Sequence, residues 1–155
     1  MRVLVLLLLL VTSAQAKLDI QHWTTPEGAK VFFAQTKGLP ILDIQLNFDA
    51  AASRDGDQYG LASLTSSLLS TATQYHNEEQ IINAFESVGA QFSSSSLKDM
   101  SIVSLRTLSR PLILKKSLDT FVEVITQPSF EQKYLTREKR QTLRAIEAAK
   151  QSPAS

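Results

Sequence analysis

The chain has 155 residues, of which 43% are hydrophobic and 20% are charged, and its formal net charge is +1. These proportions are typical of one globular domain, and the near balance of charge gives no electrostatic basis for binding nucleic acid or an anionic membrane. Because the sequence has no cysteine and only two histidines, disulfides, thiolate metal sites and cysteine nucleophiles are excluded, and histidine ligands for zinc are scarce.

Residues 1–16 have the pattern of a secretory signal peptide. Arg2 is followed by an unbroken apolar run from Val3 to Val11, and a small-x-small cleavage pattern ends at Ala16. The run is shorter than a membrane-spanning helix requires, so we expect no stable membrane insertion. The sequence therefore predicts a mature domain over residues 17–155 and export, with the periplasm as the expected compartment. The alternative is a retained N-terminal anchor.

Three strands are expected at the start of the mature chain. Residues 17–24 and 31–35 are separated by a turn at residues 25–28, and residues 41–48 alternate between apolar and polar side chains. This alternation is typical of a strand with one buried face. We expect these three strands to form a meander, with a helix crossing behind it.

Four helices and a second strand pair complete the expected fold. The first helix is expected over residues 59–69, and the second lies between Asn77 as its N-cap and Gly89 as its stop. Two strands follow, over residues 90–97 and 100–108. The third helix starts at Pro111 and ends at residues 127–129, and a charged fourth helix covers residues 131–150. This order predicts an α+β fold, with helices packed on one side of a mostly antiparallel sheet.

The first of these helices carries an unusual polar patch. Leucines recur at helical spacing along it, and Ser63, Ser66 and Ser67 point to roughly one side between them. Taken alone, this pattern favours a close helix contact or a solvated edge. A serine nucleophile is not expected, because no histidine or lysine is placed beside the three hydroxyls to activate one of them.

Several short segments follow one another in an informative order and spacing. They are Gly60-Leu61-Ala62 before a leucine-rich helix, Phe85 to Phe92, Lys98-Asp99, Pro128-Ser129-Phe130 and Glu138 to Pro153. Together they resemble the N-terminal domain of the insulinase/pitrilysin zinc peptidases, from about Ile20 onward. Chains of that family continue beyond the fourth helix, so the resemblance implies an incomplete domain that is truncated at its C-terminus.

Active members of that family carry an inverted zinc motif, H-x-x-E-H, on the helix that begins with Gly-Leu-Ala. Its histidines and a glutamate on the later charged helix bind zinc, and the glutamate between the histidines is the general base. The resemblance places the histidine positions at Ser63 and Ser67, the general base at Ser66 and the third ligand at Ala145, seven residues after Glu138. Serine and alanine cannot replace these groups, so we expect no zinc cofactor and no peptidase activity through this site.

Active and inactive subunits often pair in this family. The resemblance therefore implies a non-catalytic subunit that helps an active insulinase-family peptidase to bind peptides or to assemble. It also identifies the strand residues Gln91, Phe92, Ser93, Ser94 and Ser95 with the strand that pairs with extended peptides by β-augmentation. The residues alone favour an ordinary polar strand at this position.

Two other functions remain open from the sequence. One is a zinc metallopeptidase with a displaced site built from His22, His76, Glu78, Glu79 or Glu147, although these residues include no histidine pair at helical spacing. The other is a stand-alone peptide-binding protein of the cell envelope.

Overall fold

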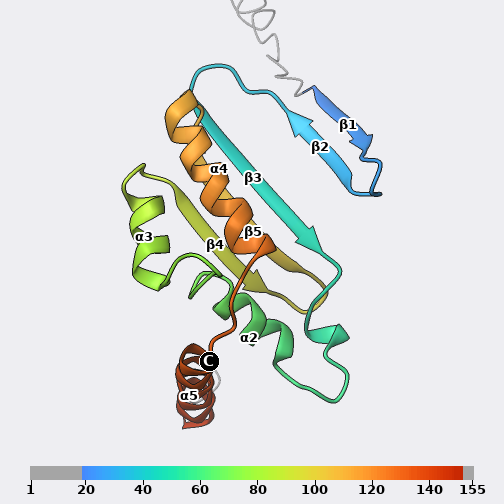
Figure 1. Ribbon diagram of the computed structural model, residues 1–155. Helices are drawn as coiled ribbons and strands as arrows, with labels where there is room; N and C mark the ends of the chain where they lie inside the picture. Colours follow the sequence, from blue (N-terminus) through green and yellow to red (C-terminus); the bar gives the residue numbers. More distant parts are fainter. Residues whose placement is uncertain (1–18, 152–155) are drawn as a thin grey trace, which may run out of the picture. The chain divides into compact units, whose positions relative to one another are not determined.

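The chain divides into two compact units, Met1–Leu39 and Pro40–Ser155, and the computed structural model describes residues 19–151 of it (Figure 1). The predicted signal peptide lies outside the described residues. In the first unit, β1 (Ile20–Thr24) and β2 (Lys30–Ala34) form an antiparallel hairpin. The Gly28 N–H closes the turn by donating to the Thr25 carbonyl at 2.9 Å, and Gly28 has a φ of 91°, which glycine adopts without strain.

The second unit is built on a three-stranded antiparallel sheet. Its strands are β3 (Ile41–Phe48), β4 (Gln91–Ser96) and β5 (Ser101–Leu108), and they lie in the order β3-β5-β4. β5, the last of the three in sequence, is therefore the central strand, and β3 and β4 flank it.

β3 has a pairing partner that the expected meander did not include. It pairs along its whole length with β5, from Ile41 opposite Leu108 to Phe48 opposite Ser101. β1 and β2 pair with each other as expected. The pairing with β5 places the apolar face of β3 beside the most deeply buried strand of the sheet.

The helices agree with the expected order. They are the short 3-10 helix η1 (Ala52–Arg54) and the α-helices α2 (Leu61–Leu68), α3 (Glu78–Glu86), α4 (Pro111–Thr126) and α5 (Gln132–Gln151). The predicted cap of α3 is confirmed as a capping box, since the Asn77 side chain accepts from the Gln80 N–H at 3.0 Å and the Gln80 side chain accepts from the Asn77 N–H at 2.9 Å.

The core lies between one face of the sheet and the helices α3 and α4 (Figure 1). The rings of Phe85 and Phe92 are stacked, with 5.4 Å between their centroids. The ring of Phe121 packs edge-on against that of Phe92, with 6.1 Å between the centroids. Val103 and Leu105 of β5 are 3% and 0% exposed in the same cluster. The predicted α+β fold, with helices on one side of an antiparallel sheet, is confirmed. Within residues 19–151, none of the helices combines the length and the apolar character needed to span a bilayer.

Candidate functional site

The amino end of α2 is held by a carboxylate from the preceding loop. Gly60 occupies the N-cap position with a φ of 90°, and it has no side chain to cap the helix. Asp55 replaces the missing cap, because its carboxylate oxygens accept from the N–H groups of Gly60 at 2.8 Å and Ala62 at 2.9 Å. Asp55 is 8% exposed, so the helix carrying the three serines begins at a fixed, buried anchor.

The three serines of α2 do not share one environment. Ser63 and Ser67 are exposed and lie one turn apart, and the Ser67 hydroxyl donates to the Ser63 carbonyl at 3.1 Å. Ser66 is only 8% exposed and faces inward. The expectation of one common polar face is therefore only partly correct, because the helix turns Ser66 toward the interior.

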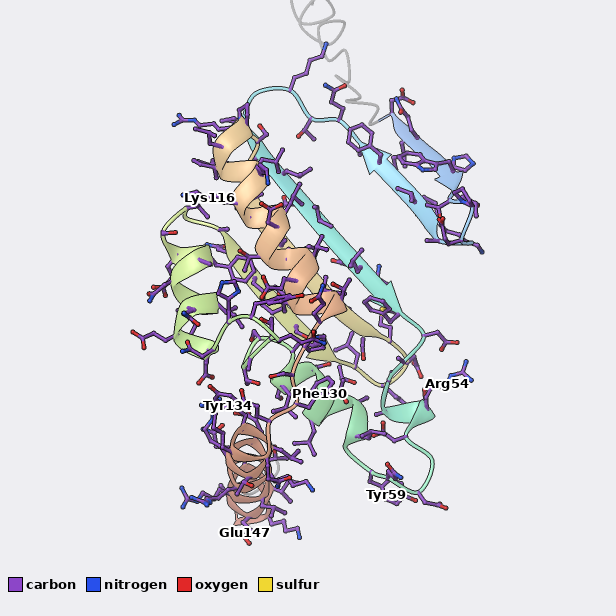
Figure 2. All side chains as sticks on the ribbon, in the orientation of Figure 1. Arg54, Tyr59, Lys116, Phe130, Tyr134 and Glu147 are labelled. Carbon is purple, nitrogen blue, oxygen red and sulfur yellow. The ribbon has the colours of Figure 1, made fainter. Side chains whose placement is uncertain are left out.

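The first turns of α5 are attached to α2 and α3. Tyr134, near the start of α5 (Figure 2), is 9% exposed and packs with Leu68 and Ala72. Arg137 donates to both carboxylate oxygens of Glu78 at 2.7 and 2.6 Å, which lowers the pKa of Glu78. This attachment fixes how α5 approaches the carboxyl end of α2.

The later turns of α5 are open to solvent. Ala145, the predicted third-ligand position, is exposed, and Glu147 lies exposed toward the far end of the helix (Figure 2). Glu138, seven residues before Ala145, accepts from Arg137 at 3.0 Å. No carboxylate of α5 therefore occupies the third-ligand position itself.

The residues at the three predicted zinc-ligand positions do not fit a zinc ion. Zinc is bound by thiolate, imidazole or carboxylate groups, and a serine hydroxyl remains protonated near neutral pH. The hydroxyl of Ser67 is already donated to the helix backbone, and Ala145 offers only a methyl group. No step of a zinc peptidase mechanism can be assigned to these side chains.

The residues proposed for a displaced zinc site have other partners or lie apart in sequence. His76 Nδ1 lies 2.7 Å from a carboxylate oxygen of Glu123, and Glu78 is paired with Arg137. His22 belongs to the hairpin of the first unit. In the part of the chain that the structure describes, no three His, Cys, Asp or Glu side chains gather closely enough to hold a metal.

The His76–Glu123 pair predicts a pH-dependent stability. Burial raises the pKa of Glu123, but hydrogen bonds from Thr73 and His76 outweigh it, so this pKa lies below its ordinary value of 4.5. A carboxyl whose pKa is lowered by folding stabilises the fold at pH values above its pKa in the unfolded chain. This contribution is lost as the pH falls through its pKa in the folded chain. Glu123→Gln should lower the unfolding free energy by about 1 kcal/mol near pH 7 and by much less near pH 3.

Urea unfolding at both pH values measures this difference. Glu79→Gln, at an exposed position in the first turn of α3, is the control and should have little effect at either pH. An equal loss of stability at both pH values for Glu123→Gln would contradict the role of the charged carboxylate.

The predicted peptide-binding residues lie on β4, which is an edge strand of the described sheet. β4 pairs with β5 on one side only. Gln91, Ser93 and Ser95 are exposed, and the Ser93 hydroxyl lies 2.9 Å from that of Ser104 on the neighbouring strand. Phe92 and Ser94 are half-buried and face the core side of the sheet. Along its other side, β4 pairs with no further strand of the described sheet, as is typical of an edge strand.

Three residues that position the site were not predicted from the sequence. The sequence indicated no role for Asp55, Glu123 or Arg137. A search for an acidic residue a few positions before the glycine that starts a helix would have found Asp55. Glu123 and Arg137 pair with residues 47 and 59 positions away, and no local pattern indicates such pairs.

Comparisons with known proteins place this fold among peptidase structures. A peptidase M16 inactive domain from Pseudomonas fluorescens matches with a TM-score of 0.85 and 39% identity, over 88% of this chain and 33% of that chain. A protease from Helicobacter pylori matches with a TM-score of 0.69 and 15% identity, over 80% of this chain and 30% of that chain, which supports the fold alone. No curated protein matches. The chain thus spans about a third of the length of these two structures.

The shared fold defines an α+β domain of the kind found in these peptidase structures. The model of the family Insulinase (Peptidase family M16) matches residues 33–155. This chain therefore belongs to the insulinase family, as its motif order predicted.

Proposed function

We propose that this chain is a non-catalytic member of the insulinase family that binds extended peptides and assists an active peptidase of the same family. The proposal is supported by Ser63, Ser67 and Ser66, which occupy the positions that the family resemblance assigns to the two histidines and the general base. These serines lie on an intact helix capped by Asp55. The likeness to a solved structure described as an inactive M16 domain supports the same view.

The peptide-binding part of the proposal rests on the edge strand β4. Main-chain groups at a sheet edge bind an added strand with little regard to its side chains, which suits varied peptide substrates. The small serine side chains at Ser93 and Ser95 leave the edge uncrowded. A peptide held there would be presented to the catalytic site of the partner rather than cut by this chain.

Proline substitutions along β4 test the peptide-binding role. Neighbouring residues of a strand direct their N–H groups to opposite sides, so one of the variants Ser94→Pro and Ser95→Pro removes an outward N–H and the other removes a bond to β5. The variant that retains the thermal stability of the native chain is expected to bind an extended peptide at least three-fold more weakly. Unchanged binding by that variant would exclude β4 as the peptide edge.

Co-purification tests the partner role. The chain is mixed with an active insulinase-family peptidase from the same cell, and co-elution and peptide hydrolysis are measured with and without it. The proposal predicts co-elution and a change in hydrolysis rate. Unchanged hydrolysis without co-elution would contradict it, and peptide binding by a chain that stays monomeric would instead favour a stand-alone peptide-binding protein.

Metal analysis of the purified chain tests the remaining catalytic alternative. A non-catalytic chain is expected to carry no stoichiometric zinc after dialysis. About one zinc ion per chain would support a displaced metallopeptidase site instead.

The proposed compartment is the periplasm, reached through cleavage of residues 1–16. The support for this proposal is the sequence pattern of a positive residue, an apolar run and a small-residue cleavage pattern. Amino-terminal sequencing of protein from a cell fraction should give a chain that starts at Lys17. A chain that starts at Met1 in the membrane fraction would indicate a retained anchor.

A further inference from the structure

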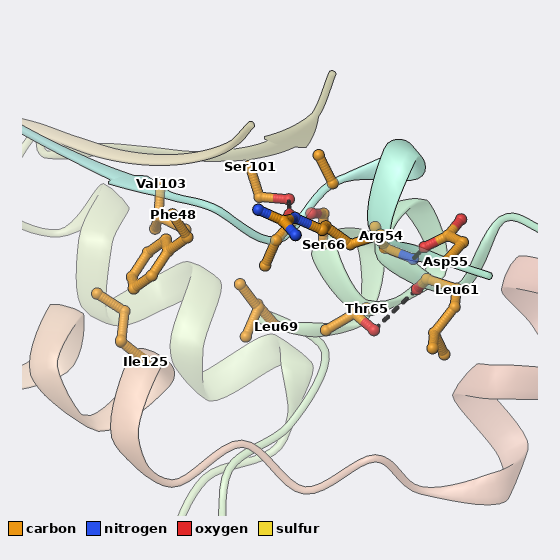
Figure 3. Close-up of a pocket in the computed structure, with 13 residues that line it drawn as sticks. Phe48, Arg54, Asp55, Leu61, Thr65, Ser66, Leu69, Ser101, Val103 and Ile125 are labelled. Carbon is orange, nitrogen blue, oxygen red and sulfur yellow. Dashed lines mark hydrogen bonds between the residues drawn. The ribbon is translucent and has the colours of Figure 1, made fainter. Parts of the chain in front are cut away.

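A cavity of about 350 Å³ lies beside Ser66 (Figure 3). Its walls come from the end of β3, the loop through η1, one side of α2, the start of β5 and the end of α4. Most of the side chains that line it are apolar, and Phe48, Leu61, Leu69 and Ile125 supply the largest of them. Cavities of this size are common binding sites for small molecules, and even an apolar cavity of about 150 Å³ can bind benzene.

Most polar groups around the cavity already have partners within the chain. The Asp55 carboxylate caps α2, Arg54 pairs with Asp49, the Thr65 hydroxyl donates to the Leu61 carbonyl, and the Ser101 hydroxyl donates to the Ala50 carbonyl. These groups are therefore not available to bind an ion inside the cavity. A charged ligand would lose its hydration there without gaining a counter-charge.

Ser66 is the exception among the polar residues that line the cavity. It is 8% exposed, and its hydroxyl makes no hydrogen bond to another described residue. A ligand in the cavity that supplies one hydrogen bond to this hydroxyl gains from the contact. The cavity thus combines an apolar wall with a single neutral hydrogen-bonding group.

We infer that the cavity beside Ser66 binds small, uncharged, largely apolar molecules that carry one hydroxyl group, with the Ser66 hydroxyl as their hydrogen-bond partner. The position that corresponds to the general base in active members of the family would then serve as the polar anchor of a ligand site. This inference is independent of peptide binding at β4, because the cavity and the outer side of β4 share no residue.

Two probes that differ by one hydroxyl test the inference. Binding of p-cresol and toluene to the full chain is measured by titration calorimetry and by ligand-observed NMR. Both probes should bind the native chain, and Ser66→Ala should weaken p-cresol binding about five-fold while leaving toluene binding unchanged. Ala62→Leu should fill the cavity and weaken both probes at least ten-fold.

Ser63→Ala is the matched control, because Ser63 lies on the same helix but is exposed and does not line the cavity. Its affinities for both probes should equal those of the native chain. The inference is wrong if the native chain binds neither probe, or if Ser66→Ala leaves p-cresol binding unchanged. It is also wrong if Ala62→Leu binds both probes with native affinity and circular dichroism shows that this variant is folded.

Discussion

A chain carrying Ser63→His, Ser67→His and Ala145→Glu is expected to bind about one zinc ion, whereas the native chain is expected to bind none. Ser63 and Ser67 are one turn apart and exposed on α2, so imidazoles at these positions can meet one ion without disturbing the core. The loss of the Ser67 hydroxyl leaves no buried group unpaired, because both residues are open to solvent. Zinc content after dialysis and protection against thermal unfolding by added zinc measure the gain.

The geometry of the two helices gives this experiment a matched control. In Ser63→His, Thr65→His, Ala145→Glu, the histidines are two residues apart and point to different sides of α2, so they cannot share a metal ion. Thr65 is exposed, so the control should fold as well as the test variant. A folded test variant that binds no more zinc than the control would show that the assignment of the metal positions is wrong.

Ser66→Glu, added to the zinc-binding variant, tests the general-base position separately. Zinc content should stay the same, because this carboxylate is not a ligand in the inverted motif. Any gain in peptide hydrolysis would then depend on the base alone. Because Ser66 is buried, this substitution is made only after the three ligand substitutions have been shown to fold.

The second large effect is expected at Asp55. Asp55→Ala should lower the free energy of unfolding by about 2 kcal/mol, because two N–H groups at the amino end of α2 would lose a charged acceptor in a buried place. Asp55→Asn retains an oxygen acceptor, so it should lower the free energy of unfolding by about half as much. Urea unfolding followed by circular dichroism measures both changes.

Asp57 provides the control for the cap. It lies two residues further along the same loop and is exposed, so Asp57→Ala should change the free energy of unfolding by less than about 0.5 kcal/mol. Equal stabilities of the Asp55→Ala and Asp57→Ala variants would show that α2 does not depend on the carboxylate cap.

Local patterns predicted the secondary structure well because each of them acts over a few residues. The alternation in residues 41–48 predicted β3, and Asn77 predicted the N-cap of α3. Ile81, Phe85 and Phe121 lie in the core, as helical spacing indicates. Ile82, Leu112 and Val122, however, are exposed. The exposed face of β3 likewise carries Asp43, whose carboxylate accepts from Arg106 of β5 at 2.6 Å.

The parts that sequence reasoning missed depend on pairs that are distant along the chain. The pairing of β3 with β5, about sixty residues later, is fixed by burial. The attachment of α5 through Arg137 and Glu78 joins residues 59 positions apart. The cavity beside Ser66 depends on how five segments meet, so no single segment of the sequence indicates it.

The family motif predicts positions for the candidate site but not the environment of each residue. From the sequence, Ser63, Ser66 and Ser67 were expected to point to roughly one side of the helix. In the structure, Ser63 and Ser67 are exposed, and the Ser67 hydroxyl donates to the Ser63 carbonyl. Ser66 is buried and lies beside a cavity. This division means that metal binding and the use of the buried position can be tested by separate substitutions.

The strand order β3-β5-β4 also affects when the second unit can fold during synthesis. Its central strand is the last of the three to leave the ribosome, so β3 and β4 emerge without the neighbour to which each is hydrogen-bonded. The sheet cannot close until Leu108 has been made and released, which delays the burial of the apolar faces of β3 and β4.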